Sequence, residues 1–74
     1  MSRFHQYKNN EEVAFGFDHA LGYFFDVFNE DDEPIIEESS LITKMNHGRM
    51  LELMVKYNVG SEEQRQKVAL DLPI

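Results

Sequence analysis

Residues 12–28 read EVAFGFDHALGYFFDVF, and this stretch decides the fold. Over positions 12–18 large apolar side chains alternate with small or polar ones, which is the period of a strand with one buried face. The run 23–28 is rich in aromatic side chains, as is typical of a second strand. The link 18–22 contains Asp18, a residue that favours turns, and a glycine. Together the two runs predict a β-hairpin.

The segments on either side of this hairpin carry weaker strand signals. A polar turn ends in Pro34, and the isoleucine pair that follows predicts a short third strand. Residues 1–10 mix polar groups with two aromatic rings and show no clear period, so they predict a loosely ordered arm or a short edge strand. We therefore expect a three-stranded antiparallel β-meander over residues 12–37.

Two segments with helix signals follow in the C-terminal part of the chain. Over positions 47–57 apolar residues recur at i, i+3, i+4 and i+7 behind Asn46, a good N-cap, and this spacing predicts a helix. Ser61 opens a capping box, which predicts a second helix over about residues 62–70. Packing both helices, within residues 46–72, on one face of the meander gives a single small α+β domain for the whole chain.

The length of 74 residues bounds what this domain can do. A chain of this size buries only roughly 60% of its unfolded surface, so a deep active-site cavity is not expected. The absence of cysteine excludes disulfides and thiolate metal sites and favours a reducing compartment. No apolar run approaches the roughly 20 residues that cross a bilayer, and the N-terminal residues lack the apolar core of a secretory signal. We therefore expect a cytoplasmic protein without a membrane partner.

The formal net charge of −7 is concentrated in the middle of the chain. Residues 1–8 carry +2, residues 9–43 carry −10 without a single lysine or arginine, and residues 44–74 carry +1. Ordinary soluble surfaces intersperse both signs, so 35 positions without a cation are unusual. Because binding to a nucleic-acid backbone requires a basic footprint, this pattern argues against direct nucleic-acid binding. It favours a protein partner that presents a basic surface.

The acidic sheet edge and the turn after the hairpin form the candidate binding surface. A run of charge often does no more than solvate a loop, and that alternative stays open. Two rings on the second face of the hairpin join the candidates, because only small residues lie opposite them and a covering group is needed. The candidate partner-binding residues are Asp26, Glu30, Asp31, Asp32, Glu33, Glu37, Glu38, Phe24 and Phe28.

Catalytic and metal sites are not expected. The turn 29–33 is rich in oxygen ligands but lacks the central glycine and the helical flanks of a calcium loop. The three histidines lie in different predicted elements, and Asp18–His19 is a lone pair in a turn without a third positioned group. The chain has neither a cysteine nucleophile nor a glycine-rich phosphate loop. We therefore expect a non-enzymatic protein without a cofactor.

Three strings of sequence resemble a group of short uncharacterised proteins from proteobacterial plasmids, phages and genomes. They are residues 16–25 (GFDHALGYFF), 48–53 (GRMLEL) and 69–73 (ALDLP). The resemblance implies a compact fold shared by the group, and it carries no functional residue. The mobile-element setting that it implies adds inhibitors of host defence to the functions considered, since many of these are small and acidic.

The sequence thus predicts a small acidic interaction protein that docks on a basic surface of a protein partner. The sharpest form of this prediction is a nucleic-acid mimic that inhibits a nucleic-acid-binding or host-defence complex. The alternative is a homo-oligomeric structural protein, such as a homodimer, assembled through the aromatic sheet. The first prediction requires negative potential to gather on one side of the folded molecule.

Overall fold

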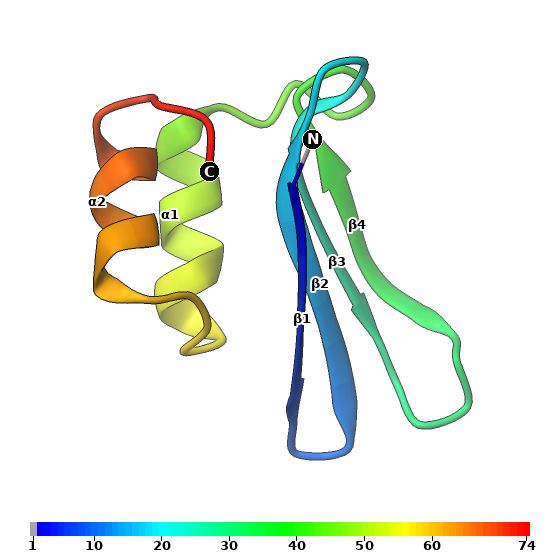
Figure 1. Cartoon of the computed structure of the whole chain (residues 1–74). Helices are drawn as coiled ribbons and strands as arrows, with labels where there is room; N and C mark the ends of the chain where they lie inside the picture. The colour runs from blue at the N-terminus through cyan, green and yellow to red at the C-terminus, as the bar shows by residue number, and fades with distance from the viewer. Residues whose placement is uncertain (1) are drawn as a thin grey trace.

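A four-stranded antiparallel sheet carries two helices on one of its faces, as the computed structural model of residues 2–74 shows (Figure 1). The strands are neighbours in space in the same order as along the chain, which makes the sheet a meander. The elements are β1 (Ser2–Lys8), β2 (Glu11–Asp18), β3 (Gly22–Phe28), β4 (Pro34–Ser39), α1 (His47–Lys56) and α2 (Glu62–Ala69). The α+β class is confirmed, whereas the prediction of three strands is wrong because the sheet has four.

β1 is the strand that the predicted count omits. It pairs with β2 along its whole length and forms one edge of the sheet. Its side chains alternate between half-buried and exposed, but the only large apolar side chain on its buried side is that of Phe4. Hydropathy therefore shows no period in this segment. The strand is ordered instead by pairing with β2 and by the ring of Phe4, which lies 5.5 Å from that of Phe15.

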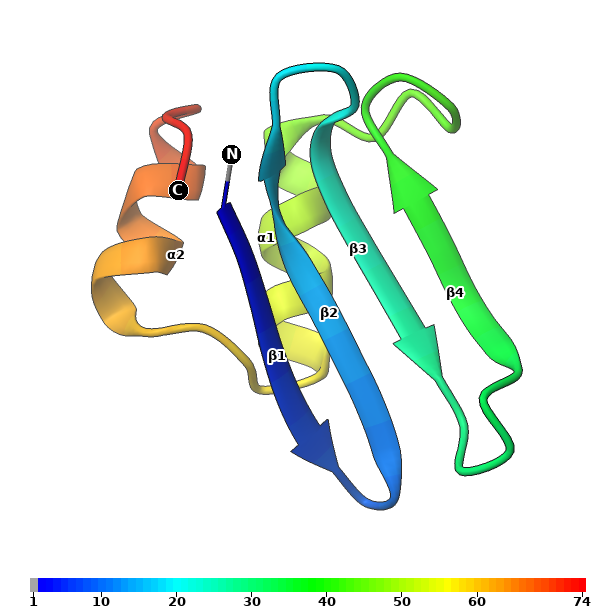
Figure 2. The same cartoon turned by 45° about the vertical axis from the view of Figure 1, so that its right-hand side comes forward.

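The core lies between the sheet and α1. Large side chains of β2 and β3 point toward the helix. They pack against three fully buried residues of α1, which lie at the predicted helical spacing. In Figure 2 α1 lies behind β2 and β3, whereas α2 lies beside β1. The buried cluster consists of Val13, Phe15, Tyr23, Phe25, Val27, Met45, Met50, Leu53, Met54, Val59 and Val68.

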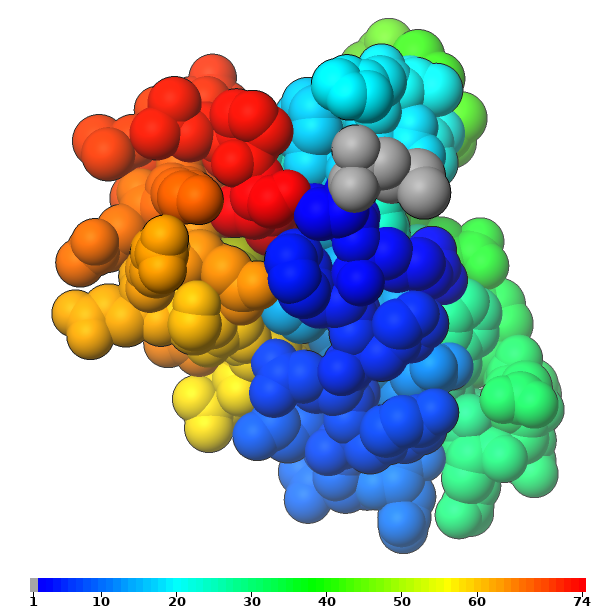
Figure 3. Space-filling model, in the orientation of Figure 1, coloured from blue at the N-terminus to red at the C-terminus, as the bar shows by residue number. Residues whose placement is uncertain are grey.

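Polar contacts attach α2 and the C-terminal residues to the rest of the molecule. A ring nitrogen of His47 lies 3.1 Å from the carbonyl oxygen of Val68, which links the first turn of α1 to the last turn of α2. The hydroxyl of Tyr23 lies 3.1 Å from the carboxylate of Asp71 and 3.0 Å from the carbonyl oxygen of Leu72. In Figure 3 the blue side chains of β1 close the front of the space between the helices and the sheet.

Both helices begin where the sequence predicts, because their N-caps form. Asn46 accepts a hydrogen bond from the backbone N–H of Arg49 at 2.9 Å. Ser61 and Gln64 complete a reciprocal capping box at the start of α2. Within residues 2–74 neither helix has the length and apolar character needed to cross a membrane.

Candidate interaction surface

Four of the nine candidate residues lie on the sheet face that points away from the helices, and four more lie in the β3–β4 turn. Figure 2 looks onto this face, which we call the open face. The strand register aligns its side chains in rows across the sheet. Three rows of the open face consist of Arg3, His5, Tyr7, Glu12, Ala14, Gly16, Phe24, Asp26, Phe28, Glu37 and Ser39.

The β3–β4 turn presents four consecutive carboxylates at one end of the open face. Glu30, Asp31, Asp32 and Glu33 are all exposed. The side-chain oxygen of Asn29 accepts hydrogen bonds from the backbone N–H groups of Asp31 and Glu33, both at 2.9 Å. This Asx-type bonding satisfies the turn internally, so the carboxylates are not needed to hold it and stay directed to solvent.

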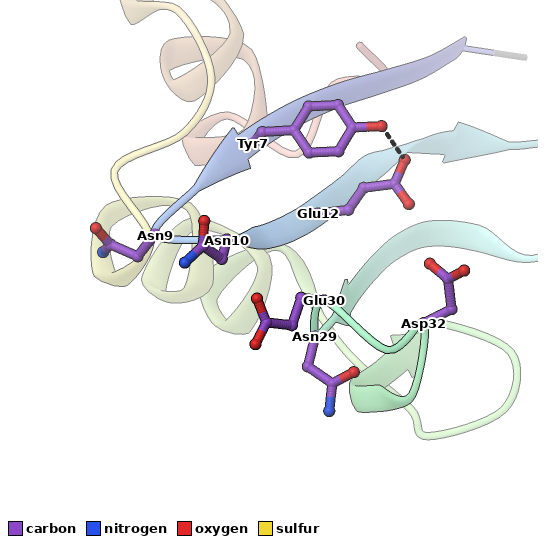
Figure 4. A pocket seen from close by; sticks show the side chains of 7 residues that line it. All are labelled: Tyr7, Asn9, Asn10, Glu12, Asn29, Glu30 and Asp32. Atoms are coloured by element: carbon purple, nitrogen blue, oxygen red, sulfur yellow. Dashed lines mark hydrogen bonds between the residues drawn. The ribbon is translucent and has the colours of Figure 1, made fainter.

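A hollow of about 520 Å³ lies between this acidic turn and the β1–β2 turn (Figure 4). Two carboxylates of the acidic turn line the hollow, together with side-chain amide groups from both turns. In Figure 4 the hydroxyl of Tyr7 points to Glu12, with which it forms a hydrogen bond of 3.4 Å. The lining residues are Tyr7, Asn9, Asn10, Glu12, Asn29, Glu30 and Asp32. The hollow extends the negative surface of the turn onto the open face.

Asp26 and Glu37 continue the negative surface along the middle of the open face. The register places them directly opposite each other on β3 and β4. Partial burial raises the pKa of the Asp26 carboxyl; the Arg3 guanidinium opposes this shift and the Glu37 charge adds to it. An acid that is half-buried beside a second acid is costly to ionise, and Arg3 offsets part of that cost for Asp26.

Glu38 lies on the other face of the sheet, in contact with α1. Its two carboxylate oxygens accept hydrogen bonds from the guanidinium of Arg49, at 3.1 Å and 2.7 Å. These bonds lower the pKa of Glu38, and Arg49 also pairs with Glu52. Of the seven predicted carboxylates, Glu38 is therefore the one that a cation of the helical half already neutralises.

The two candidate rings differ in how much surface they offer. Phe24 is only 5% exposed, because the guanidinium of Arg3 covers it at 5.4 Å from the ring centroid. Gly16 lies opposite Phe24, as expected from the hairpin register. Phe28 is half-buried and lies beside the acidic turn. A partner can therefore reach Phe28 more readily than Phe24.

A hydrogen-bonded chain on β1 and β2 brings positive charge onto the open face, which sequence reasoning missed. The Nε–H of Arg3 donates to Nε2 of His5 at 3.1 Å. Nε2 must then be an acceptor, so Nδ1 carries the proton and donates to Glu12 at 2.9 Å. The sequence does contain a signal for this chain of hydrogen bonds. Residues 1–8 carry a charge of +2, and Arg3 and His5 are two positions apart, so a strand places them on one face.

Negative charge still dominates this side of the molecule. These three rows of the open face and the β3–β4 turn hold seven carboxylates against the guanidinium of Arg3. The ion pairs among residues 2–74 involve other acids: they are Arg49–Glu38, Arg49–Glu52 and Lys67–Glu63. Glu12 accepts a hydrogen bond from His5. The acidic turn, Asp26 and Glu37 thus form a predominantly acidic surface, which Arg3 compensates only in part and which we call the acidic surface below.

Other polar side chains have structural partners. One carboxylate oxygen of Asp18 accepts hydrogen bonds from the backbone N–H groups of Ala20 and Leu21, and the ring of His19 packs edge-on against Phe17. The Asp18–His19 pair therefore stabilises the β2–β3 turn. In the part of the chain that the structure describes, no group of three or more His, Asp or Glu side chains is arranged to hold a metal ion.

Comparison with protein-family models, with curated proteins and with solved structures finds no match for this chain.

Proposed function

We propose that this protein is a non-enzymatic interaction protein that docks its acidic surface on a basic surface of a protein partner. The observation that carries the proposal is the excess of seven carboxylates over one guanidinium on a single side of the sheet. Such a field attracts a partner of opposite charge and raises its association rate. The carboxylates of the acidic turn are available for this role, since the turn is held by Asn29 rather than by ion pairs.

The proposed form of docking is mimicry of a nucleic-acid backbone. A nucleic-acid-binding groove presents lysine and arginine side chains to a row of phosphates. The acidic surface supplies a row of anions on a rigid sheet and turn, without cations of its own between Asn9 and Thr43. A protein that fills such a groove blocks it, which makes an inhibitor of a nucleic-acid-binding or host-defence complex the specific function proposed. The resemblance to proteins of plasmids and phages supports the same choice.

The decisive experiment measures how charge and salt control binding to the partner. A tagged chain captures partners from cells of the source organism, and the affinity of the purified partner is then measured at about 50 mM and about 300 mM salt. The double variant Asp31→Asn/Asp32→Asn removes two charges from the acidic turn. We expect this variant to bind the partner about three- to tenfold more weakly at low salt. We expect high salt to lower the affinity of the parent protein by a similar factor.

The matched control removes the same charge from the helical side. Glu62→Gln/Glu63→Gln changes two exposed carboxylates in the first turn of α2, away from the open face. We expect this control to bind within about twofold of the parent protein, because its charges do not face the partner. Equal losses in the two double variants, or an affinity that does not respond to salt, would show that the acidic surface does not direct docking.

A further inference from the structure

A second hollow opens on the sheet between the β2–β3 turn, β3 and β4, with a volume of about 250 Å³. We call it the β3–β4 hollow. Leu21, Phe24 and Ile42 give it an apolar wall, and Asp26 and Glu37 place carboxylates beside that wall. A site with an apolar wall and carboxylates at its end suits a side chain that has an apolar stem and a positively charged end.

The two carboxylates of the hollow belong to residues that lie directly opposite each other on β3 and β4. The backbone N–H of Ser40 donates to the carbonyl oxygen of Tyr23 at 2.9 Å, so these two residues form a hydrogen-bonded pair of the ladder. Asp26 is three positions from Tyr23 and faces Glu37, so these acids form a non-hydrogen-bonded pair, the closer kind. Two like charges in such a pair destabilise the sheet, and a cation between them removes that cost.

The apolar wall is held in place rather than left loose. Ile42 is 72% exposed, which is unusual for a large aliphatic side chain beside charged groups. Its backbone N–H donates to the hydroxyl of Ser39 at 3.0 Å, and the N–H of Leu41 donates to the carbonyl of Leu21 at 3.0 Å. These bonds fix the backbone of the loop after β4 against the β2–β3 turn, so the position of Ile42 at the rim of the hollow is defined.

The molecule already binds one guanidinium on this part of the open face. Arg3 stacks over the ring of Phe24 at 5.4 Å, and its charge favours the ionised form of Asp26. Arg3 reaches Phe24 and Asp26 from β1, whereas the hollow lies on the side of these two residues that faces β4. Asp26 and Glu37 together outnumber Arg3 by one charge, which leaves one negative charge for a second cation.

We propose that the β3–β4 hollow receives an arginine side chain of the protein partner. The methylene groups of the arginine pack on Leu21 and Ile42, and its guanidinium lies between Asp26 and Glu37. A planar guanidinium bonds two separate carboxylates better than the compact ammonium of lysine does. This inference rests on the proposed docking function and names its anchor point.

The experiment uses a blocked tripeptide, acetyl-Gly-Arg-Gly-amide, as the probe of isotope-labelled protein in NMR titrations. The matched probe carries citrulline, which keeps the shape and the planar group of arginine without the charge. We expect saturable shifts of the backbone amides of Leu21, Asp26, Glu37 and Ile42 with the arginine probe. The citrulline probe should bind too weakly to saturate these shifts.

Protein variants test the assignment to the hollow. Asp26→Asn and Glu37→Gln should each weaken binding of the arginine probe about two- to fivefold, as expected for the loss of one partly exposed ion pair. Both variants remove a like-charge contact, so neither is expected to unfold the protein. Asp32→Asn, which removes the same charge from the acidic turn, should change the affinity by less than about twofold.

Three results would overturn the proposal: shifts centred on the acidic turn, equal binding of the citrulline probe, or an Asp32→Asn loss as large as that of Glu37→Gln. Failure of the hollow is distinguishable from failure of docking itself. A captured partner that depends on Asp31 and Asp32 but binds the Asp26→Asn variant normally would uphold the docking function. That result would reject only the arginine site.

Discussion

Among single residues, small side chains and close charges decide how the two outer strands attach. Gly16 is the clearest case, because a Cβ at this position would lie 2.2 Å from the carbonyl oxygen of Ser2 on β1. No real contact is that short, so β1 approaches β2 closely only because residue 16 has no side chain. Toward the opposite edge of the same sheet, Asp26 and Glu37 lie opposite each other on β3 and β4. Their like charges weaken the pairing of these two strands.

Substitution of Gly16 by alanine is therefore expected to destabilise the sheet. The added methyl group must push the backbone of β1 away, and we expect the free energy of unfolding to fall by about 1–3 kcal/mol. Gly48→Ala is the matched control, since its Cβ meets only the side-chain oxygen of Asn46 at 3.4 Å. In helix α1 this change should be neutral or stabilise by up to about 1 kcal/mol. Urea denaturation of both variants checks the prediction, and a neutral Gly16→Ala would contradict it.

The pH dependence of stability should separate Asp26 from Glu38. Burial raises the pKa of Asp26, so its protonated form supports the fold below the unfolded pKa, and this support is lost as the pH rises through the raised pKa. Hydrogen bonds from Arg49 lower the pKa of Glu38, so its contribution is present above the unfolded pKa and is lost as the pH falls through the lowered one.

Two isosteric variants test these opposite signs by denaturation at neutral and at acid pH. Asp26→Asn should stabilise the protein at pH 7 by about 0.2–1 kcal/mol, because the variant no longer has an ionised carboxylate that is partly buried and lies opposite a second acid. Glu38→Gln should destabilise it at pH 7, because the guanidinium of Arg49 loses its ionised partner. Both differences should shrink at acid pH, where the parent carboxyl groups are protonated. Destabilisation by Asp26→Asn at pH 7 would show that the attraction of Arg3 outweighs the cost of burial and the repulsion by Glu37 together.

Among the secondary-structure elements, α2 depends most on contacts made outside itself. α1 buries three apolar residues in the core, whereas α2 buries only Val68. Its capping box sets its start, and the residues after it are tied to β3 by the hydroxyl of Tyr23. Burial and the neighbouring Asp71 raise the pKa of Tyr23 to about 12, so this hydroxyl stays protonated and donates at neutral pH.

Loss of the Tyr23 hydroxyl should therefore loosen the C-terminal part of the chain. We expect Tyr23→Phe to lower the free energy of unfolding by about 1–2 kcal/mol, since the contact joins two distant segments and one acceptor is charged. Tyr57→Phe is the control: this ring packs on Phe25 at 5.7 Å, and its loss of hydroxyl should cost less than about 0.5 kcal/mol. Hydrogen exchange should show faster opening of α2 only in Tyr23→Phe. Unchanged exchange in that variant would refute the role given to the hydroxyl.

For the protein as a unit, the charge distribution also bears on self-association. β4 is an edge strand that begins with Pro34 and carries Glu37 among its exposed residues, two features that discourage pairing with another strand. Two copies meeting through their open faces would also bring their acidic surfaces together, and like charges repel. The homodimer alternative therefore lacks a favourable surface on this side.

We expect a monomer at micromolar concentration and moderate salt. Sedimentation velocity checks this expectation, and the variant Asp31→Asn/Asp32→Asn tests whether charge repulsion contributes to it. A stable dimer of the parent protein, with the amide signals of β4 or of the open face protected from exchange, would favour the homo-oligomeric structural alternative over docking on a foreign partner.

The sequence alone was sufficient to predict the elements that have a strong local signal. The hairpin of β2 and β3 follows from alternation, and the starts of α1 and α2 follow from Asn46 and Ser61, because side-chain periods and caps act over a few residues. The excess of acid over residues 9–43 was equally visible. β1 was not predicted as a full strand, since its mostly polar side chains give no period until β2 is present to pair with it.

Only the tertiary structure decided which charges meet. Glu38 and Asp26 belong to neighbouring strands, yet Glu38 faces Arg49 of α1, whereas Asp26 lies on the opposite face beside Glu37. Arg3 covers Phe24 because register brings β1 and β3 to either side of Gly16. Net charge is a sum over the chain and is fixed by composition. Its compensation is a matter of distance, and the sheet register and the placement of α1 set those distances.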